Sequence, residues 1–501
     1  MKVRKQNLCD TCRKRKLQCD GKRPACTQCL FSSRSCEGYP DALFVPFVAP
    51  KTAVKPRTRP KPVSWAKLSI PAHTQYPSGN EPGRTQAKDQ WTRRSQQGTV
   101  TYSALSPLDE SHLPGLSTVQ EKVSVILRNF IPIQELEHDA ADTCERCSRF
   151  CGSWALALPE LTADTNGPFS QCLHSAVSAL ALSITAYRNG ENLLDAIVAQ
   201  YEESLRLLGH SLAVVGDTYR SKLVAAVMCL ALTEVMSPTQ ESSWLIHVEG
   251  VSSMVQLMPP EIFASGTEHT MLIGFRPLLI LKAFILRKAT FFAEQAWRTL
   301  PFQYQQAAPL QSLLGVAVHI PGILERIDTA LPACSDDAGT AEQFITELMG
   351  SMTQLKTWHA SFLASTSEST YWRRSVEHDV CGTFESLWYP SLGIANVFVY
   401  FWVFQLLCLL EIQGLSNRLP ELRPAAYGAE DLQDECLELS TCIYKSMEYL
   451  LQEEFMLYGI ASAGFALSIA CETLQSDSKG HAILERLDCS LITRARIRTY
   501  V

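Results

Sequence analysis

The 501-residue sequence lacks an apolar run behind its basic first residues, MKVRKQNLCD, so we expect no secretory signal. Without export, the 18 cysteines would face a reducing compartment, where disulfides rarely persist. Clustered cysteines in such a compartment more often bind a metal ion. The cysteines are therefore expected to include metal ligands rather than to form a disulfide framework.

Motifs typical of enzymes are also missing. The sequence contains no G-x-S-x-G, no H-E-x-x-H, no G-x-x-x-x-G-K and no suitably placed G-x-G-x-x-G. The triplet Ser335-Asp336-Asp337 is too short for an acidic metal-binding motif and is interpreted as a loop. His247 lies near an apolar helix face, where a satisfied core histidine is expected rather than a ligand. We therefore predict that the protein is not an enzyme.

Strand-like alternation is scarce, no fixed-period repeat is evident, and no sustained heptads suggest a coiled coil. From about Leu116 onward, apolar residues instead recur at helical spacing, as they do in Glu191–Leu212. Other stretches with this helical pattern are Phe169–Tyr187, Tyr219–Met236, Trp244–Met258, Leu278–Phe292, Ala341–Leu363, Ile394–Ile412, Leu432–Leu451 and Phe455–Leu474. The sequence predicts one large all-α domain over residues 115–501.

The most apolar of these stretches, IANVFVYFWVFQLLCLL at Ile394–Leu410, raises a membrane alternative. It is 17 residues long, which is at the short limit for a bilayer span. It contains Asn396 and Gln405 and has no basic flank. We interpret it as a buried helix of the large domain and expect no membrane partner.

Charge is divided unevenly along the chain. Residues 1–111 contain 20 Lys and Arg against 8 Asp and Glu, a net charge of +12, whereas the remainder has a net charge of −18. Residues 40–114 are rich in Pro, Ser, Thr, Gly and Gln, and Lys51–Pro62 is basic and proline-spaced. The pattern predicts a mostly disordered linker over 40–114 and a basic head that meets a polyanion.

Within that head, six cysteines fall in the 28 residues from Cys9 to Cys36, with the spacing C-x2-C-x6-C-x6-C-x2-C-x6-C. The spacing divides into two similar halves, and each offers three thiolates. Two tetrahedral zinc ions need eight ligand positions, which six thiolates fill if two of them bridge both metals. Such a short segment cannot fold on its own core, whereas structural zinc supplies about 10–16 kcal/mol to modules of this kind. The spacing predicts a small zinc-stapled two-helix module with two structural zinc ions.

The first half also carries the basic run Arg13–Lys16. With 10 Lys and Arg and 2 Asp in residues 1–36, the module would stay positive after binding two zincs. Such charge suits the phosphate backbone, and Lys or Arg can reach O6 and N7 of guanine in the major groove. The basic run could instead be a solvated helix face or a nuclear-import signal. The cysteine block could instead be a metal store or a disulfide-bonded secreted module.

Residues Cys9 to Cys36 resemble the fungal binuclear zinc cluster found at the N-terminus of many fungal transcription factors. The resemblance covers the cysteines, the basic run and Pro24 of the loop between the halves. It implies a cluster domain over residues 1–39 with the zinc ligands Cys9, Cys12, Cys19, Cys26, Cys29 and Cys36. It implies DNA contacts from Arg13, Lys14, Arg15, Lys16, Lys22 and Arg23.

The resemblance also implies a role for individual cysteines and basic residues. Cys9 and Cys26 would bridge the two zincs, while the other cysteines of each half would complete one site each. Lys16, with Arg15, would lie at the base-reading end of the first helix. The family typically reads CGG-type triplets, whereas the residues themselves indicate only a preference for guanine.

The body more loosely resembles the helical regulatory region that follows such clusters in fungal factors. The stretches that carry the resemblance are Trp154–Pro159, His247–Leu257, Arg287–Trp297 and Val397–Cys408.

Two further features of the body have two interpretations each. Cys144, Cys147 and Cys151, with His138, could hold a zinc or be ordinary small apolar residues. The acidic run Glu430–Leu439 is either an activating surface or one solvated helix face.

Together these features predict a nuclear, sequence-specific DNA-binding regulator of transcription, with an activator favoured over a repressor. Its expected partners are double-stranded DNA, a second copy of the chain and the transcription machinery. Regulation of a secondary-metabolite pathway is the favoured role. The alternatives are a non-specific architectural DNA-binding protein and a helical enzyme with a zinc-cluster head.

Overall fold

The computed structural model describes residues 11, 14, 29, 118–131, 153–164, 166–189, 192–215, 221–239, 243–330, 338–366, 369–375, 385–424, 427–476 and 478–487. The chain divides into two compact units, Met1–Pro60 and Lys61–Val501. The predicted linker, residues 40–114, lies outside the described residues. The helices and strands of the second unit given below are those of the described residues.

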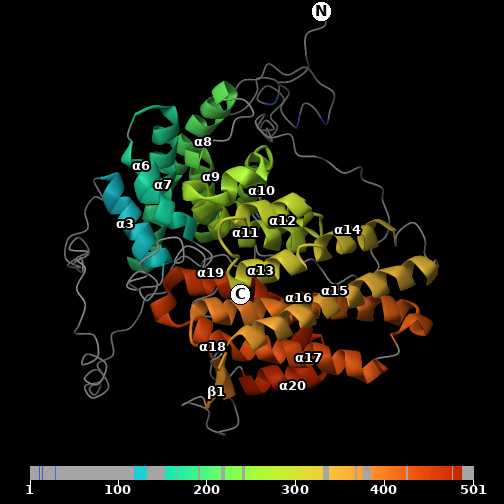
Figure 1. Cartoon of the computed structure of the whole chain (residues 1–501). Coiled ribbons are helices and arrows are strands. Elements are labelled where there is room, and N and C mark those ends of the chain that lie inside the picture. The colour runs from blue at the N-terminus through green and yellow to red at the C-terminus, as the bar shows by residue number, and fades with distance from the viewer. Residues whose placement is uncertain are drawn as a thin grey trace, which may run out of the picture. The chain divides into compact units, whose positions relative to one another are not determined.

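The second unit is helical throughout most of its described length, which confirms the predicted all-α class (Figure 1). Its first group of helices comprises α3 (Val119–Phe130), α6 (Leu158–Ala163), α7 (Pro168–Asn189), α8 (Leu194–Val215), α9 (Ser221–Met236), α10 (Ser243–Gln256), α11 (Gly266–Leu286), α12 (Gln295–Thr299), α13 (Pro309–Ala317) and α14 (Ile320–Ala330). Its second group comprises α15 (Ala338–Ser365), α16 (Leu392–Arg418), α17 (Ala429–Lys445), α18 (Met447–Leu450), α19 (Met456–Gln475) and α20 (Ser478–Leu487).

Short elements join or extend these helices. Turns of 3-10 helix are η2 (Ser153–Ala157), η3 (Pro260–Ala264), η4 (Phe291–Ala293), η5 (Leu300–Phe302), η6 (Pro420–Leu422) and η7 (Glu453–Phe455). Two strands, β1 (Trp372–Ser375) and β2 (Glu385–Trp388), pair antiparallel with Trp372 opposite Trp388. This pair of strands was not predicted from the sequence.

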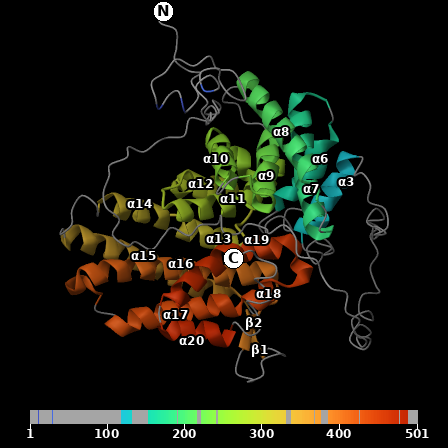
Figure 2. The same ribbon diagram turned by 180° about the vertical axis from the view of Figure 1, so that it is seen from behind.

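The two groups of helices lie one above the other, with α15, α16, α17 and α20 stacked beneath the first group in both views (Figures 1 and 2). In the first group, α7 packs against α3, α8 and α9. In the second group, α16 packs against α15, α17 and α19, and it also contacts α13 of the first group. Helix α16 therefore belongs to the core shared by both groups.

Among the described helices, four are long and apolar enough to cross a membrane by length and composition, and α16 has the highest mean hydropathy of the four. Within the domain, 83% of the apolar window of α16 is buried. Asn396 Nδ2 donates to Tyr458 Oη of α19 at 3.2 Å, and Gln405 Nε2 donates to the Phe401 carbonyl of α16 itself at 3.4 Å. The prediction that Ile394–Leu410 is a core helix is confirmed.

Two predicted helices differ most from the helices of the structure. The stretch Leu278–Phe292 is wrong at both ends, because α11 begins at Gly266, passes through Pro277 and ends at Leu286. Arg287 then adopts a left-handed conformation (φ 52°), and Phe291 starts a separate 3-10 turn. Leu432–Leu451 is also wrong as one helix, because it breaks at Ser446 into α17 and α18. The apolar pattern continues across both breaks, so periodicity alone does not reveal them.

The stretch Trp154–Pro159 begins in η2, which packs against α11. Trp154 is only 2% exposed. The contact needs a residue without a side chain on α11, because a Cβ on Gly274 would lie 2.3 Å from the Trp154 backbone nitrogen. The small residue therefore sets how closely these two segments approach.

Candidate DNA interface and regulatory sites

Three residues of the cysteine block are described, and all three are helical: Thr11, Lys14 and Cys29. Cys29 is 2% exposed and forms no disulfide, while Lys14 is exposed. A thiol turned inward and a cation turned outward are the arrangement that a metal-folded, DNA-binding module needs. The remaining five cysteines, together with Arg13, Arg15, Lys16, Lys22 and Arg23, lie outside the described residues.

The donor set of the block fits zinc. Thiolate is a preferred ligand of structural zinc, and structural sites keep no position open for water. When bound, the two ions would supply the cross-links that a segment of this size cannot obtain from a hydrophobic core. The chain's own contribution is the spacing of the thiols and the positive charge between them.

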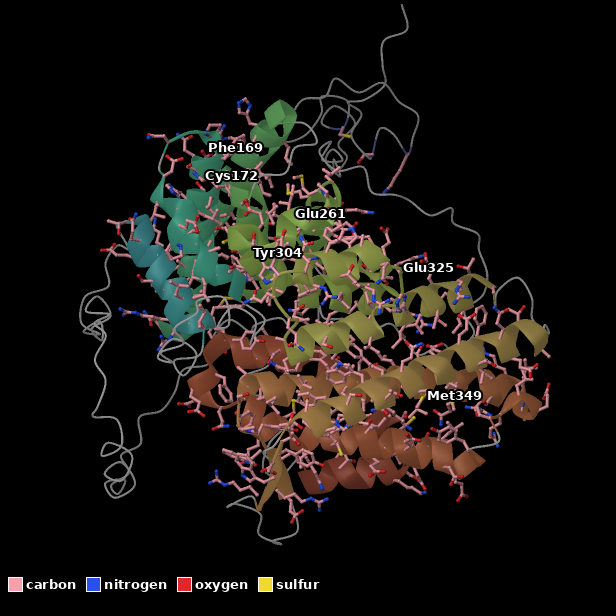
Figure 3. The ribbon with its side chains drawn as sticks, in the orientation of Figure 1. Phe169, Cys172, Glu261, Tyr304, Glu325 and Met349 are labelled. Atoms are coloured by element: carbon pink, nitrogen blue, oxygen red, sulfur yellow. The ribbon has the colours of Figure 1, made fainter. Side chains whose placement is uncertain are left out.

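Elsewhere, the part of the chain that the structure describes contains no group of three or more His, Cys, Asp or Glu side chains that could hold a metal ion. His138, Cys144, Cys147 and Cys151 lie outside it, so a zinc site there stays a prediction. The buried thiols of the body stay protonated at neutral pH and are therefore poor metal ligands. Burial raises the pKa of Cys172 on α7 to about 11 (Figure 3) and that of Cys408 to about 12.

His247 is a satisfied histidine, as predicted. Its Nε2 atom lies 2.7 Å from the hydroxyl of Tyr201, which comes from α8. Glu234 of α9 is 2% exposed and accepts hydrogen bonds from the Thr239 N–H and hydroxyl at 2.8 and 2.7 Å. Burial and the neighbouring Glu234 raise the pKa of Tyr201. The cluster ties α8, α9 and α10 together.

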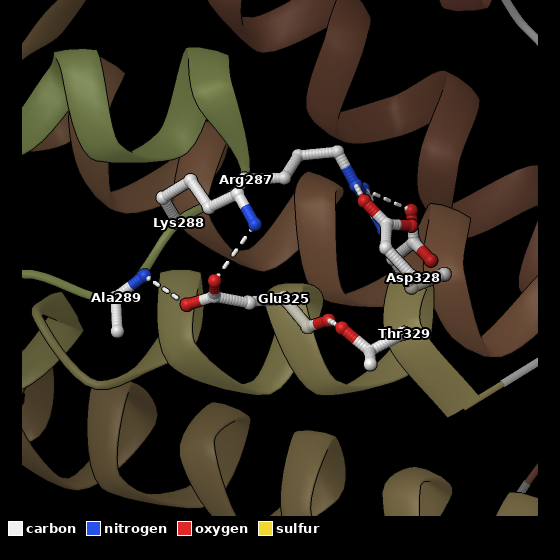
Figure 4. A network of polar contacts seen from close by, with 7 residues as sticks. Arg287, Lys288, Ala289, Glu325, Asp328 and Thr329 are labelled. Carbon is white, nitrogen blue, oxygen red and sulfur yellow. Dashed lines mark hydrogen bonds and ion pairs between the residues drawn. The ribbon is translucent and has the colours of Figure 1, made fainter. Parts of the chain in front are cut away.

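An ion-pair network joins the two helix groups at the end of α11 (Figure 4). Arg287 Nε donates to Asp328 Oδ2 at 2.8 Å and Nη2 to Oδ1 at 3.2 Å, so this pair is bidentate. Arg287 Nη1 also donates to Glu411 Oε1 of α16 at 2.5 Å. Burial alone would lower the pKa of Arg287, but the two carboxylates outweigh it and raise that pKa.

The next two residues extend the network to a second carboxylate of α14. Glu325 accepts from Lys288 Nζ at 2.7 Å and from the Ala289 N–H at 2.9 Å (Figure 4). These two hydrogen bonds lower the pKa of the Glu325 carboxyl. The network therefore lies at the start of Arg287–Trp297, one of the stretches that carry the resemblance. It fixes where α11 ends relative to α14 and α16.

The acidic run Glu430–Leu439 lies in helix α17, where Leu432, Cys436 and Leu437 are buried. Its carboxylates at positions 431, 434 and 438 are exposed on the other side, as both a solvated helix face and an activating surface require. The structure adds a groove of about 550 Å³ beside this face. The groove is lined by Lys356 of α15, by Phe401, Trp402 and Gln405 of α16, and by Asp431, Asp434, Glu435, Glu438 and Leu439 of α17.

Comparison with known protein families identifies both parts of the chain. Residues 8–43 match the fungal Zn(2)-Cys(6) binuclear cluster domain, and residues 154–491 match the fungal specific transcription factor domain. The chain belongs to the fungal-specific transcription factors. No curated protein and no solved structure matches it.

As a fungal-specific transcription factor with a zinc-cluster domain, the protein is a DNA-binding regulator of transcription that binds two zinc ions. Both matched families are families of transcription factors rather than of enzymes. The resemblance identified from the cysteine spacing and the four body stretches is confirmed. Sequence reasoning missed the Arg287 network and the groove, because their partners come from helices far apart in the chain.

Proposed function

We propose that the protein is a nuclear activator that reads guanine-rich, CGG-like half-sites and controls a pathway-specific set of genes, with secondary-metabolite biosynthesis favoured. The observation that carries this proposal is the position of two described residues in the matched cluster domain. Cys29 is buried while Lys14 is exposed, as expected when thiols bind metal inside and cations face the duplex. The net charge of +12 over residues 1–111 supports a polyanionic partner.

The roles of individual residues follow from this proposal. Cys9 and Cys26 bridge the two zincs, Cys12 and Cys19 complete one site, and Cys29 and Cys36 complete the other. The DNA-contacting residues are Arg13, Lys14, Arg15, Lys16, Lys22 and Arg23. Lys16 contacts a guanine edge, where a cationic donor meets the O6 and N7 acceptors.

The three segments have separate tasks in the proposal. Residues 1–39 read DNA, residues 40–114 link the parts and carry import signals, and residues 115–501 regulate, dimerise or recruit the transcription machinery. Nuclear action agrees with the family to which the chain belongs.

Selection from randomised duplexes tests the DNA-reading part. The full-length protein, loaded with zinc, should enrich sites that contain CGG triplets, and a chelated sample should enrich none. Enrichment without any motif would favour a non-specific architectural protein instead.

Transcript profiling of a deletion strain tests the direction of regulation. Loss of transcripts from a group of neighbouring biosynthetic genes is expected for a pathway-specific activator. A rise of the same transcripts would identify a repressor, and changes scattered over unrelated genes would contradict a pathway-specific role.

A further inference from the structure

The groove beside α17 presents a row of carboxylates. Those of Asp431, Asp434, Glu435 and Glu438 share one side of the helix because they follow helical spacing. The aromatic residues Phe401 and Trp402 of α16 also line the groove, but they are only 5% and 8% exposed. The carboxylates are therefore the groups that recognise a cation here, and an arginine guanidinium can pair with a carboxylate through two hydrogen bonds.

The carboxylates of the groove exceed its cations. Lys356 Nζ lies 3.4 Å from Glu435 Oε1, and Lys479 Nζ lies 2.9 Å from Asp434 Oδ1. Asp431 accepts from the Gly428 N–H at 2.7 Å, which caps α17. Within the described part of the chain, Glu438 forms no ion pair. The groove therefore retains negative charge that a further cation would balance.

The residues that follow α20 carry a matching positive charge. The stretch Asp488–Val501 reads DCSLITRARIRTYV, with arginines at positions 494, 496 and 498. Residues two apart in an extended segment point to the same side and are separated by about 6.6–6.8 Å. Carboxylates four apart on a helix are separated by about 6 Å along its axis. The two rows therefore have similar spacing.

The position of α20 makes the groove accessible to this stretch. Lys479, in the first turn of α20, pairs with Asp434 at the groove, and α20 lies beside α17 in both views (Figures 1 and 2). The helix ends at Leu487, seven residues before Arg494, and seven extended residues span up to about 25 Å. Because α20 itself is about 15 Å long, the arginines can return to the groove.

We propose that the groove between α15, α16 and α17 binds the arginine-bearing stretch Thr493–Arg498 of the same chain in an extended conformation. The guanidinium groups pair with Glu438, Glu435 and the neighbouring carboxylates of α17. This stretch supplies the positive charge that the groove lacks, and it is close enough to the end of α20 to reach the groove. The proposal does not depend on the function of the zinc cluster.

Carbodiimide cross-linking of the full-length protein tests the contact directly. The variant Arg496→Lys keeps the positive charge and supplies an amine, which condenses with a nearby carboxylate to an amide. Mass spectrometry should find position 496 joined to Glu435 or Glu438 within one chain. The double variant Glu435→Gln/Glu438→Gln should lose this product, whereas the matched variant Glu430→Gln, on α17 but not lining the groove, should keep it.

Limited trypsin digestion gives a second measurement on the unmodified sequence. Cleavage after Arg494, Arg496 and Arg498 should be about tenfold slower in the native protein than in Glu435→Gln/Glu438→Gln. Equal rates and no cross-link within the chain would overturn the proposal. Cross-links found only between copies would also overturn it, because the groove would then receive a second molecule. Cross-linking of an added unrelated Lys/Arg peptide to Glu438, with Thr493–Arg498 unprotected, would assign the groove to a basic partner instead.

Discussion

The side-chain amide of Gln311 donates a 2.8 Å hydrogen bond to the carbonyl of Ile273. Pro277, four residues further along α11, has no N–H to give to this carbonyl, so the helix alone would leave it unpaired. Gln311 also accepts from Arg276 Nη1, at 2.8 Å to Oε1 and 3.0 Å to the backbone carbonyl. A single residue of α13 thus pairs both the carbonyl that Pro277 leaves without a donor and one nitrogen of a buried guanidinium.

Gln311→Ala is expected to lower the free energy of unfolding by about 2–4 kcal/mol, because it leaves the Ile273 carbonyl unpaired and removes a side-chain acceptor from Arg276. Urea denaturation followed by tryptophan fluorescence measures this change. The matched variant Gln343→Ala, at an exposed position of α15, should stay within about 0.5 kcal/mol of the parent. Equal effects of the two substitutions would contradict the role assigned to Gln311.

Two glycines in helix interiors should respond in opposite ways to a methyl group. Gly274→Ala places a Cβ 2.8 Å from Trp154 Cβ and closer still to its backbone, so we expect a loss of about 1–3 kcal/mol or more. Gly350→Ala on α15 meets nothing within 4 Å and should stabilise by about 0.5–1 kcal/mol. Thermal melting of the two variants, compared under the same conditions, tests the close approach of η2 and α11.

The ion pair between Lys288 and Glu325 should make part of the stability depend on pH. Because the pKa of Glu325 is lowered in the folded protein, its contribution is present above the pKa of the unfolded chain and is lost as pH falls through the folded value. Glu325→Gln should therefore lower the melting temperature more at pH 7 than at pH 3.5. The partly exposed pair contributes less than about 1 kcal/mol. A difference that grows on acidification would have the wrong sign, and Glu342→Gln provides an exposed control.

Removal of one shared thiolate should disable the zinc module. Cys26→Ala is expected to retain fewer than two zinc ions per chain, because this cysteine is proposed to bind both metals. Native mass spectrometry counts the ions directly. The control Cys442→Ala, in the helical body, should keep both, whereas two zincs in Cys26→Ala would contradict the bridging assignment.

Lys16→Ala should change what the protein reads rather than only how tightly it binds. We expect a loss of about 1–3 kcal/mol of discrimination at one guanine position. Competition binding between duplexes that differ at that base measures it. Lys51→Ala, in the proline-spaced basic stretch, serves as the control, because a change there should leave base preference intact. An unaltered preference in Lys16→Ala would remove this residue from base contact.

Much of the fold class was predictable because helical periodicity is a local property of the chain. The steps of three and four in Glu191–Leu212 and the continuous apolar run of Ile394–Leu410 identify helices α8 and α16 without reference to neighbours. The limits of α11 were not predictable in this way. Pro277 is tolerated inside it because Gln311 compensates for the lost donor, and the sequence does not place those two residues together.

The sequence by itself determined the family, the metal and the kind of partner, since six thiols at fixed spacing and an adjacent basic run carry that chemistry within 28 residues. Only the tertiary structure decided which helices of the body contact one another. It brings Arg287 to Asp328 and Glu411, and it sets the carboxylates of α17 beside Trp402. These contacts depend on the packing of helices far apart in the chain, which periodicity along one helix does not encode.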